Sequence, residues 1–143
     1  MEDFCHRFRR SRCATTAIEF AIVAPFLFAI MFGIIGFGMQ FATHIALTYA
    51  ATEGGRAAVA GLNDGERETL ARGAITKALT ALKPLIKVGN ATISFDMTAE
   101  ATDQKINIGI AYNDTRFAVL PFVPNFNNQA PVTVTYYVTD PSG

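Results

Sequence analysis

A run of 33 residues without Asp, Glu, Lys or Arg, from Phe20 to Thr52, constrains this chain more than any other feature. The first part of the run, Phe20 to Met39, is almost wholly apolar, and about 20 such residues are needed to cross the hydrocarbon core of a bilayer. A soluble protein could bury a helix that is apolar all round, but the rest of a 143-residue chain is too small to enclose one. The run therefore predicts a transmembrane helix.

The charge distribution predicts how this helix is oriented. Residues 1–14 carry a net charge of +2, from Arg7, Arg9, Arg10 and Arg12 against two acidic residues, whereas the chain as a whole is neutral. Arginines before a span and none close behind it favour a cytoplasmic N-terminus and an extracytoplasmic C-terminal domain. A cleaved signal peptide fits less well, because its apolar stretch is usually about 7–15 residues long. The neutral balance also argues against a nucleic-acid partner.

The chain has few residues of the types that usually catalyse reactions or bind metals, and they are poorly placed for either role. Both cysteines, Cys5 and Cys13, lie in the basic leader, and the two histidines are His6 and His44. Neither histidine has a carboxylate or thiol at metal-ligand spacing, and no histidine follows residue 44 to complete a Ser-His-Asp set. We therefore expect no metal, no cofactor and no enzymatic activity.

Helical periodicity continues beyond the apolar run. Residues 40–60 are rich in Ala, and Phe41, Ile45 and Tyr49 recur at i, i+4 and i+8, which predicts that this face packs. Gly54-Gly55 weakens the helix by about 1 kcal/mol per glycine and lets another backbone approach. A Gly-rich break at 61–65 then ends it.

A second, amphipathic helix is predicted after this break. Asn63, with Glu66 three residues later, has the pattern of a capping box. The helix is expected to run to about Leu82 and to be stopped by Pro84. Its apolar stripe comprises Leu70, Ala74, Ile75, Ala78, Leu79 and Leu82.

After Gly89 the apolar period changes from 3.6 to 2, which predicts three strands. The alternating apolar positions lie in 93–97, 106–112 and 132–138. They predict an antiparallel sheet with one face covered by the helices, hence an α+β fold. The connection 114–131 is long and apolar; it is either a loop folded over the sheet end or a contact surface for a subunit or membrane. The predicted organisation is a leader over 1–14, an N-terminal helix over 15–60 and a domain over 61–143.

Glu19 immediately precedes the apolar run. A carboxylate inside a bilayer costs a few kcal/mol and usually marks function, whereas the same group among lipid headgroups costs little. Position alone leaves both interpretations open.

The surrounding residues, Arg12-Cys-Ala-Thr-Thr-Ala-Ile-Glu-Phe-Ala-Ile-Val-Ala-Pro25, resemble the prepilin-peptidase site of TadE-like pseudopilins of tight-adherence pili. The shared features are a basic leader, a small residue, four further residues, then Glu-Phe and an apolar helix with an early proline. Ala14 stands where the family most often has Gly. A second segment, Glu53-Gly54-Gly55-Arg56, resembles the family's Glu-Gly-x-Arg motif beyond the membrane.

The resemblance implies specific roles for these residues. Cleavage would fall between Ala14 and Thr15, and Glu19 would pair with the freed amine of a neighbouring subunit's Thr15, beside Phe20. The implied partners are the inner membrane, a prepilin peptidase, other pilin or pseudopilin subunits and the pilus assembly machinery. The predicted function is a non-catalytic minor pilin or pseudopilin of a type IV-like pilus. The alternatives are a single-pass envelope protein whose domain binds a partner without polymerising and, less favoured, a membrane-tethered enzyme.

Overall fold

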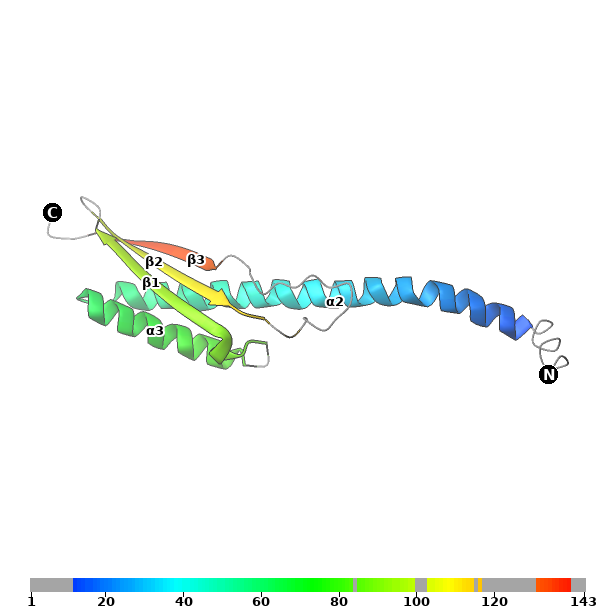
Figure 1. Cartoon of the computed structure of the whole chain (residues 1–143). Coiled ribbons are helices and arrows are strands. Elements are labelled where there is room, and N and C mark those ends of the chain that lie inside the picture. Colours follow the sequence, from blue (N-terminus) through cyan, green and yellow to red (C-terminus); the bar gives the residue numbers. More distant parts are fainter. Residues whose placement is uncertain (1–11, 84, 100–102, 115, 117–130, 140–143) are drawn as a thin grey trace.

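A computed structural model describes residues 12–83, 85–99, 103–114, 116 and 131–139. One helix, α2 (Arg12–Val59), dominates the molecule; at 1.5 Å per residue its 48 residues span about 72 Å. Its C-terminal part packs into a small α+β domain, and its N-terminal part projects from that domain (Figure 1). We call this projecting part, residues 15–42, the apolar arm. The predicted fold class is confirmed.

The apolar arm has the length and composition of a membrane span. The segment Thr15–Val59 contains a stretch long and apolar enough to cross a bilayer. Pro25 lies inside α2, where it removes one backbone donor, and the helix bends gently over its N-terminal part (Figure 1). Proline is tolerated in membrane helices because neighbouring groups satisfy the freed carbonyl.

The second helix, α3 (Asp64–Ala81), runs back along α2 in the opposite direction (Figure 1). Asn63 caps its start, accepting a hydrogen bond at 2.9 Å from the Glu66 amide, as the capping box predicts. The reciprocal bond differs from the usual box, because the Glu66 carboxylate accepts from the Leu62 amide at 3.0 Å. The buried positions of α3 are Ala71, Ile75, Ala78 and Leu79. Leu70, which we expected on this stripe, is 39% exposed, and the neighbouring Ala71 is fully buried instead.

A three-stranded antiparallel sheet, as predicted, covers the helix pair. Its strands are β1 (Ala91–Ala99), β2 (Asp103–Tyr112) and β3 (Val132–Thr139), in the order β1-β2-β3. A short 3₁₀ turn, η1 (Val88–Asn90), leads into β1. The β3 side of the sheet lies over α2 and the β1 side over α3.

The core lies between the helices and the inner face of the sheet. Ile106, Ile108 and Ile110 of β2 are fully buried there, and they face Ile75, Leu79 and Ile86 from the helical layer. The outer face of the sheet carries the alternate polar residues, as the period-2 pattern predicts. Of the remaining predictions, Pro84 and almost all of the 114–131 connection lie outside the described residues.

Candidate functional site on the N-terminal helix

The residues predicted for processing and subunit pairing lie in the first turns of α2. The structure describes α2 from Arg12 onward, so the Ala14–Thr15 bond lies close to the start of its described part. Thr15, Glu19 and Phe20 are all exposed. Thr15 and Glu19 are four residues apart and therefore lie on the same side of the helix.

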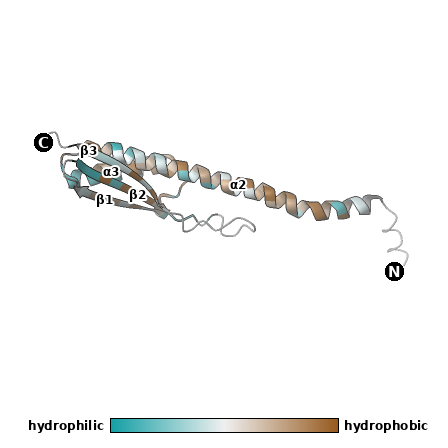
Figure 2. Cartoon of the chain, turned by 90° about the horizontal axis from the view of Figure 1, so that it is seen from above, coloured by the Kyte–Doolittle hydropathy of each residue, from teal (hydrophilic) through white to brown (hydrophobic). Residues whose placement is uncertain are grey.

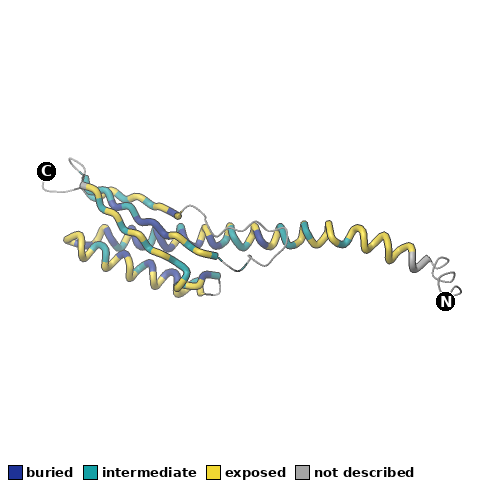
Figure 3. The backbone as a smooth tube through the Cα atoms, in the orientation of Figure 1, coloured by how far each residue is buried: buried dark blue, intermediate teal, exposed yellow. Residues whose placement is uncertain are grey.

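Large apolar side chains surround the arm on every side. Figure 2 shows this part of α2 as predominantly hydrophobic, and Figure 3 shows it as predominantly exposed. Seven of them are between 51% and 70% exposed: Ile18, Phe20, Ile22, Phe26, Ile30, Ile34 and Ile35. An apolar surface this extensive is typical of a site that meets lipid or another protein.

The face of α2 that packs into the domain is not the predicted one. Phe41, Ile45 and Tyr49 are 68%, 53% and 55% exposed, so the prediction that they form the packing face is wrong. Most of the buried residues in this part of α2 are small, Leu47 being the exception, and four of them recur at a spacing of four: Ala46, Ala50, Gly54 and Ala58. Small side chains occupy this face because they let α3 approach α2 closely. We call these four residues the small-residue seam.

The Glu53-Gly54-Gly55-Arg56 motif sits where α2 meets both other layers. A Cβ on Gly54 would lie 2.5 Å from Cγ1 of Ile75 in α3 and 3.4 Å from the Ala71 carbonyl oxygen. A Cβ on Gly55 would overlap the ring of Tyr136 in β3. The close approach expected at this glycine pair is therefore made mainly by two side chains, with the α3 backbone just behind.

The polar ends of the same motif face outward. The Glu53 carboxylate and the Arg56 guanidinium lie 3.9 Å apart, and the Arg56 side chain is 71% exposed. An exposed pair at this distance contributes little to stability. The glycines thus have a structural role in this chain, while the Arg56 side chain extends into solvent.

Arg116 forms a cluster that no local sequence pattern indicates. Its guanidinium donates hydrogen bonds to both carboxylate oxygens of Asp114, at 2.8 and 2.6 Å. It also donates to the Leu85 carbonyl at 2.6 Å and to the Thr43 hydroxyl at 3.1 Å. Thr43 is buried and donates in turn to the Met39 carbonyl at 2.9 Å. This Arg116 cluster ties the end of the sheet and the turn after α3 to the point where the arm leaves the domain.

The cluster shifts the ionisation of both charged members. The hydrogen bond from Arg116 holds the pKa of Asp114 below its ordinary value of 3.8, against a smaller opposing effect of burial, and the charge of Lys87 adds to the lowering. The same hydrogen bond raises the pKa of Arg116. Both groups are therefore charged throughout the physiological range.

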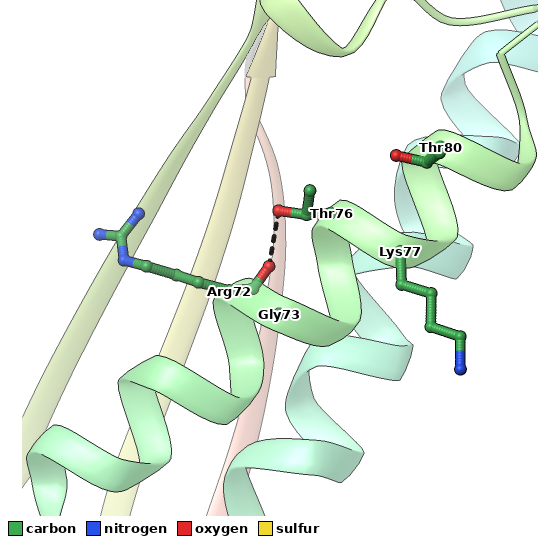
Figure 4. A pocket seen from close by; sticks show the side chains of 5 residues that line it. All are labelled: Arg72, Gly73, Thr76, Lys77 and Thr80. Atoms are coloured by element: carbon green, nitrogen blue, oxygen red, sulfur yellow. Dashed lines mark hydrogen bonds between the residues drawn. The ribbon is translucent and has the colours of Figure 1, made fainter.

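A shallow hollow on the exposed side of α3 is lined by Arg72, Gly73, Thr76, Lys77 and Thr80 (Figure 4). Its groups are a guanidinium, an ammonium and two hydroxyls, and Thr76 donates its hydroxyl proton to the Arg72 carbonyl at 2.8 Å. Arg72 is paired with Glu68 at 2.7 Å. The lining holds no acid or base positioned to activate either hydroxyl. Within the described part of the chain, no group of three His, Cys, Asp or Glu side chains is arranged to hold a metal ion.

Residues 14–56 match the family model described as TadE-like protein. Over these residues the chain is similar to TadE-like proteins. The resemblance inferred from the sequence is therefore confirmed over 14–56. No curated protein and no solved structure gives a match to the chain.

The bounds of the TadE-like segment coincide with features of α2. It begins at Ala14, beside the predicted cleavage point, and ends at Arg56, the last residue of the glycine motif. It therefore contains the apolar arm and most of the small-residue seam. The second helix and the sheet lie beyond it.

Proposed function

We propose that this protein is a membrane-anchored minor pilin or pseudopilin, a non-catalytic structural or assembly subunit of a tight-adherence, type IV-like pilus. The observation that carries the proposal is that the TadE-like segment coincides with a long helix whose first half is apolar and largely exposed. Such a helix has two uses in succession. It anchors the subunit in the bacterial inner membrane before assembly, and it packs among the helices of neighbouring subunits afterwards.

Glu19 and Thr15 supply the proposed contact between subunits. Cleavage after Ala14 by a prepilin peptidase frees the amine of Thr15, and the Glu19 carboxylate of an adjacent chain neutralises it. Removing one partner of such a pair in an apolar setting leaves an uncompensated charge, which is strongly destabilising. The exposure of Thr15, Glu19 and Phe20 on one end of α2 supports this role, because a neighbouring chain has access to all three.

The experiment that tests the proposal is N-terminal sequencing of the protein recovered from the membrane fraction. A pseudopilin begins at Thr15 when the prepilin peptidase is present and keeps its leader when the peptidase is deleted. The matched control is a variant with a bulky residue at the cleavage point, Ala14→Leu, which should keep the leader in both strains. A parent chain that retains Met1 and residues 2–14 would instead support the non-polymerising envelope protein.

A reporter fused after Gly143 tests the orientation separately. The arginines at 7, 9, 10 and 12 should direct the reporter to the extracytoplasmic side, and their replacement by neutral residues should give a mixed orientation. A cytoplasmic reporter in the parent chain would contradict the proposal, because the domain could not then join an external filament.

A further inference from the structure

The end of the α+β domain where the arm leaves carries an excess of positive charge. At the end farthest from the arm, the acidic Asp64, Glu66 and Asp103 are balanced by Arg56, Arg67 and Lys105. Gln104 donates to Asp64 at 2.8 Å, which places the start of β2 beside the start of α3 at this end. At the end where the arm leaves, Lys83, Lys87, Asp114 and Arg116 give a net charge of +2.

The fold brings the two lysines to the level of Thr43. The Arg116 guanidinium bonds both Thr43 and Leu85, so the turn that contains Lys83 and Lys87 lies beside this point of α2. The amide of Lys87 donates to the Tyr112 hydroxyl at 3.2 Å, which holds the turn against the end of β2. Both lysines are exposed. Arg116 is largely neutralised by Asp114, so the excess positive charge resides on Lys83 and Lys87.

This level coincides with the headgroup region, on the basis of the membrane span in the proposed function. Phe20 to Met39 is the stretch that matches the hydrocarbon core, and Thr43 lies four residues, or about 6 Å, beyond it. The headgroup layer on each side of the core is about 5–8 Å thick. Lys83 and Lys87 therefore lie where lipid phosphates lie.

We propose that Lys83 and Lys87 form a basic rim that binds the headgroups of anionic phospholipids in the outer leaflet of the inner membrane. The ligand is the lipid phosphate as part of a charged surface, and not a free phosphate ion. Each lysine near such a surface strengthens the interaction, and salt weakens it.

The test uses the full chain in lipid nanodiscs of phosphatidylglycerol and phosphatidylcholine. Spin-labelled lipids report the relative association of each headgroup with the protein. The parent chain should associate preferentially with phosphatidylglycerol. The Lys83→Gln/Lys87→Gln variant should show a severalfold weaker preference. The matched control, Lys77→Gln/Lys105→Gln, removes the same charge from positions farther from the membrane and should keep it. The leader arginines recruit anionic lipid equally in all variants, so they cancel in the comparison.

Three further measurements make the outcome decisive. Lys83→Arg/Lys87→Arg should behave as the parent, and raising the salt concentration should erase the difference between the parent and the glutamine variant. Inorganic phosphate should compete no better than chloride at equal ionic strength; specific competition would assign the site to free phosphate and overturn the lipid proposal. Equal selectivity in the parent and the Lys83→Gln/Lys87→Gln variant would overturn the rim alone. A chain that does not insert into nanodiscs would overturn the membrane span and the rim with it.

Discussion

The hydroxyl of Tyr136, in the last strand, donates a hydrogen bond at 3.1 Å to the backbone carbonyl of Thr52, 84 residues earlier in the long helix. The ring of the same tyrosine lies against Gly55. One side chain therefore fixes the third strand on the helix through both a polar and a steric contact. The hydrogen bond and the steric contact are tested separately below.

Tyr136→Phe tests the hydrogen bond. The ring stays in place while the Thr52 carbonyl loses its extra donor, so the unfolding free energy should fall by about 1 kcal/mol. The control is Tyr137→Phe on the adjacent residue, whose side chain is 59% exposed on the other face, and it should change stability by less than about 0.5 kcal/mol. Denaturant unfolding of the full chain in detergent, followed by circular dichroism, measures both. Equal effects at the two tyrosines would refute the assignment.

A pair of glycine substitutions tests the steric contact. Gly55→Ala places a methyl group in the Tyr136 ring and should destabilise the domain by about 1–3 kcal/mol, as overpacking does. Gly73→Ala on α3 meets no atom within 4 Å and should stabilise it by up to about 1 kcal/mol through helix propensity. Thermal melts of the two variants should therefore move in opposite directions from that of the parent.

The two faces of α2 should respond differently to truncation. Leu47 is 5% exposed, so Leu47→Ala should cost about 2–5 kcal/mol, whereas Ile45→Ala, on the exposed face, should cost less than about 1 kcal/mol. The measurement is again denaturant unfolding. A large loss at Ile45 and none at Leu47 would restore the packing face expected from the sequence.

Asp114 makes stability depend on pH in the acid range. Its folded pKa lies below 3.8, so its charge stabilises the folded state above that value, and this contribution is lost as the pH falls through the folded pKa. Asp114→Asn should cost about 1 kcal/mol at pH 7, and the gap between variant and parent should narrow below about pH 4. Unfolding curves from pH 3 to pH 7 give the comparison. A gap that is independent of pH would show that the carboxylate charge has no part in it.

Glu19 separates assembly from membrane insertion. Glu19→Ala and Glu19→Gln should both reach normal membrane levels, because a carboxylate contributes nothing to insertion. Both should lose filament assembly or pilus-dependent attachment, because each leaves the neighbouring Thr15 amine unpaired. Immunoblots of membrane fractions and attachment assays on the same cells supply the two measurements. Full attachment with Glu19→Ala would make Glu19 a headgroup-region residue without a role in pairing.

The sheet and the second helix were predictable because their signals are local. The alternation of Ile106, Ile108 and Ile110 with polar residues defines the buried face of β2, and Asn63 with Glu66 marks the start of α3. The packing face of α2 was not predictable from apolar periodicity. Phe41, Ile45 and Tyr49 are the more hydrophobic stripe, but a close helix pair selects Ala46, Ala50 and Gly54 by size.

The candidate site, too, was predictable from the sequence only in part. The TadE-like signature around Glu19 is a contiguous pattern, so the sequence alone revealed it. The Arg116 cluster joins residues 73 positions apart, and the level of Lys83 and Lys87 depends on that long-range contact. No spacing rule along the chain encodes such a relationship, so it emerges only from the folded structure.

Because α2 is helical without a break from the arm into the domain, the two parts share one rotational phase. Each residue of an α-helix advances about 1.5 Å and turns by about 100°. A single residue inserted between the arm and the seam would therefore rotate the whole domain by roughly a quarter turn relative to the side chains of the apolar arm, although neither part would change internally. The direction in which the domain faces its surroundings is thus set by the number of residues between the arm and the small-residue seam.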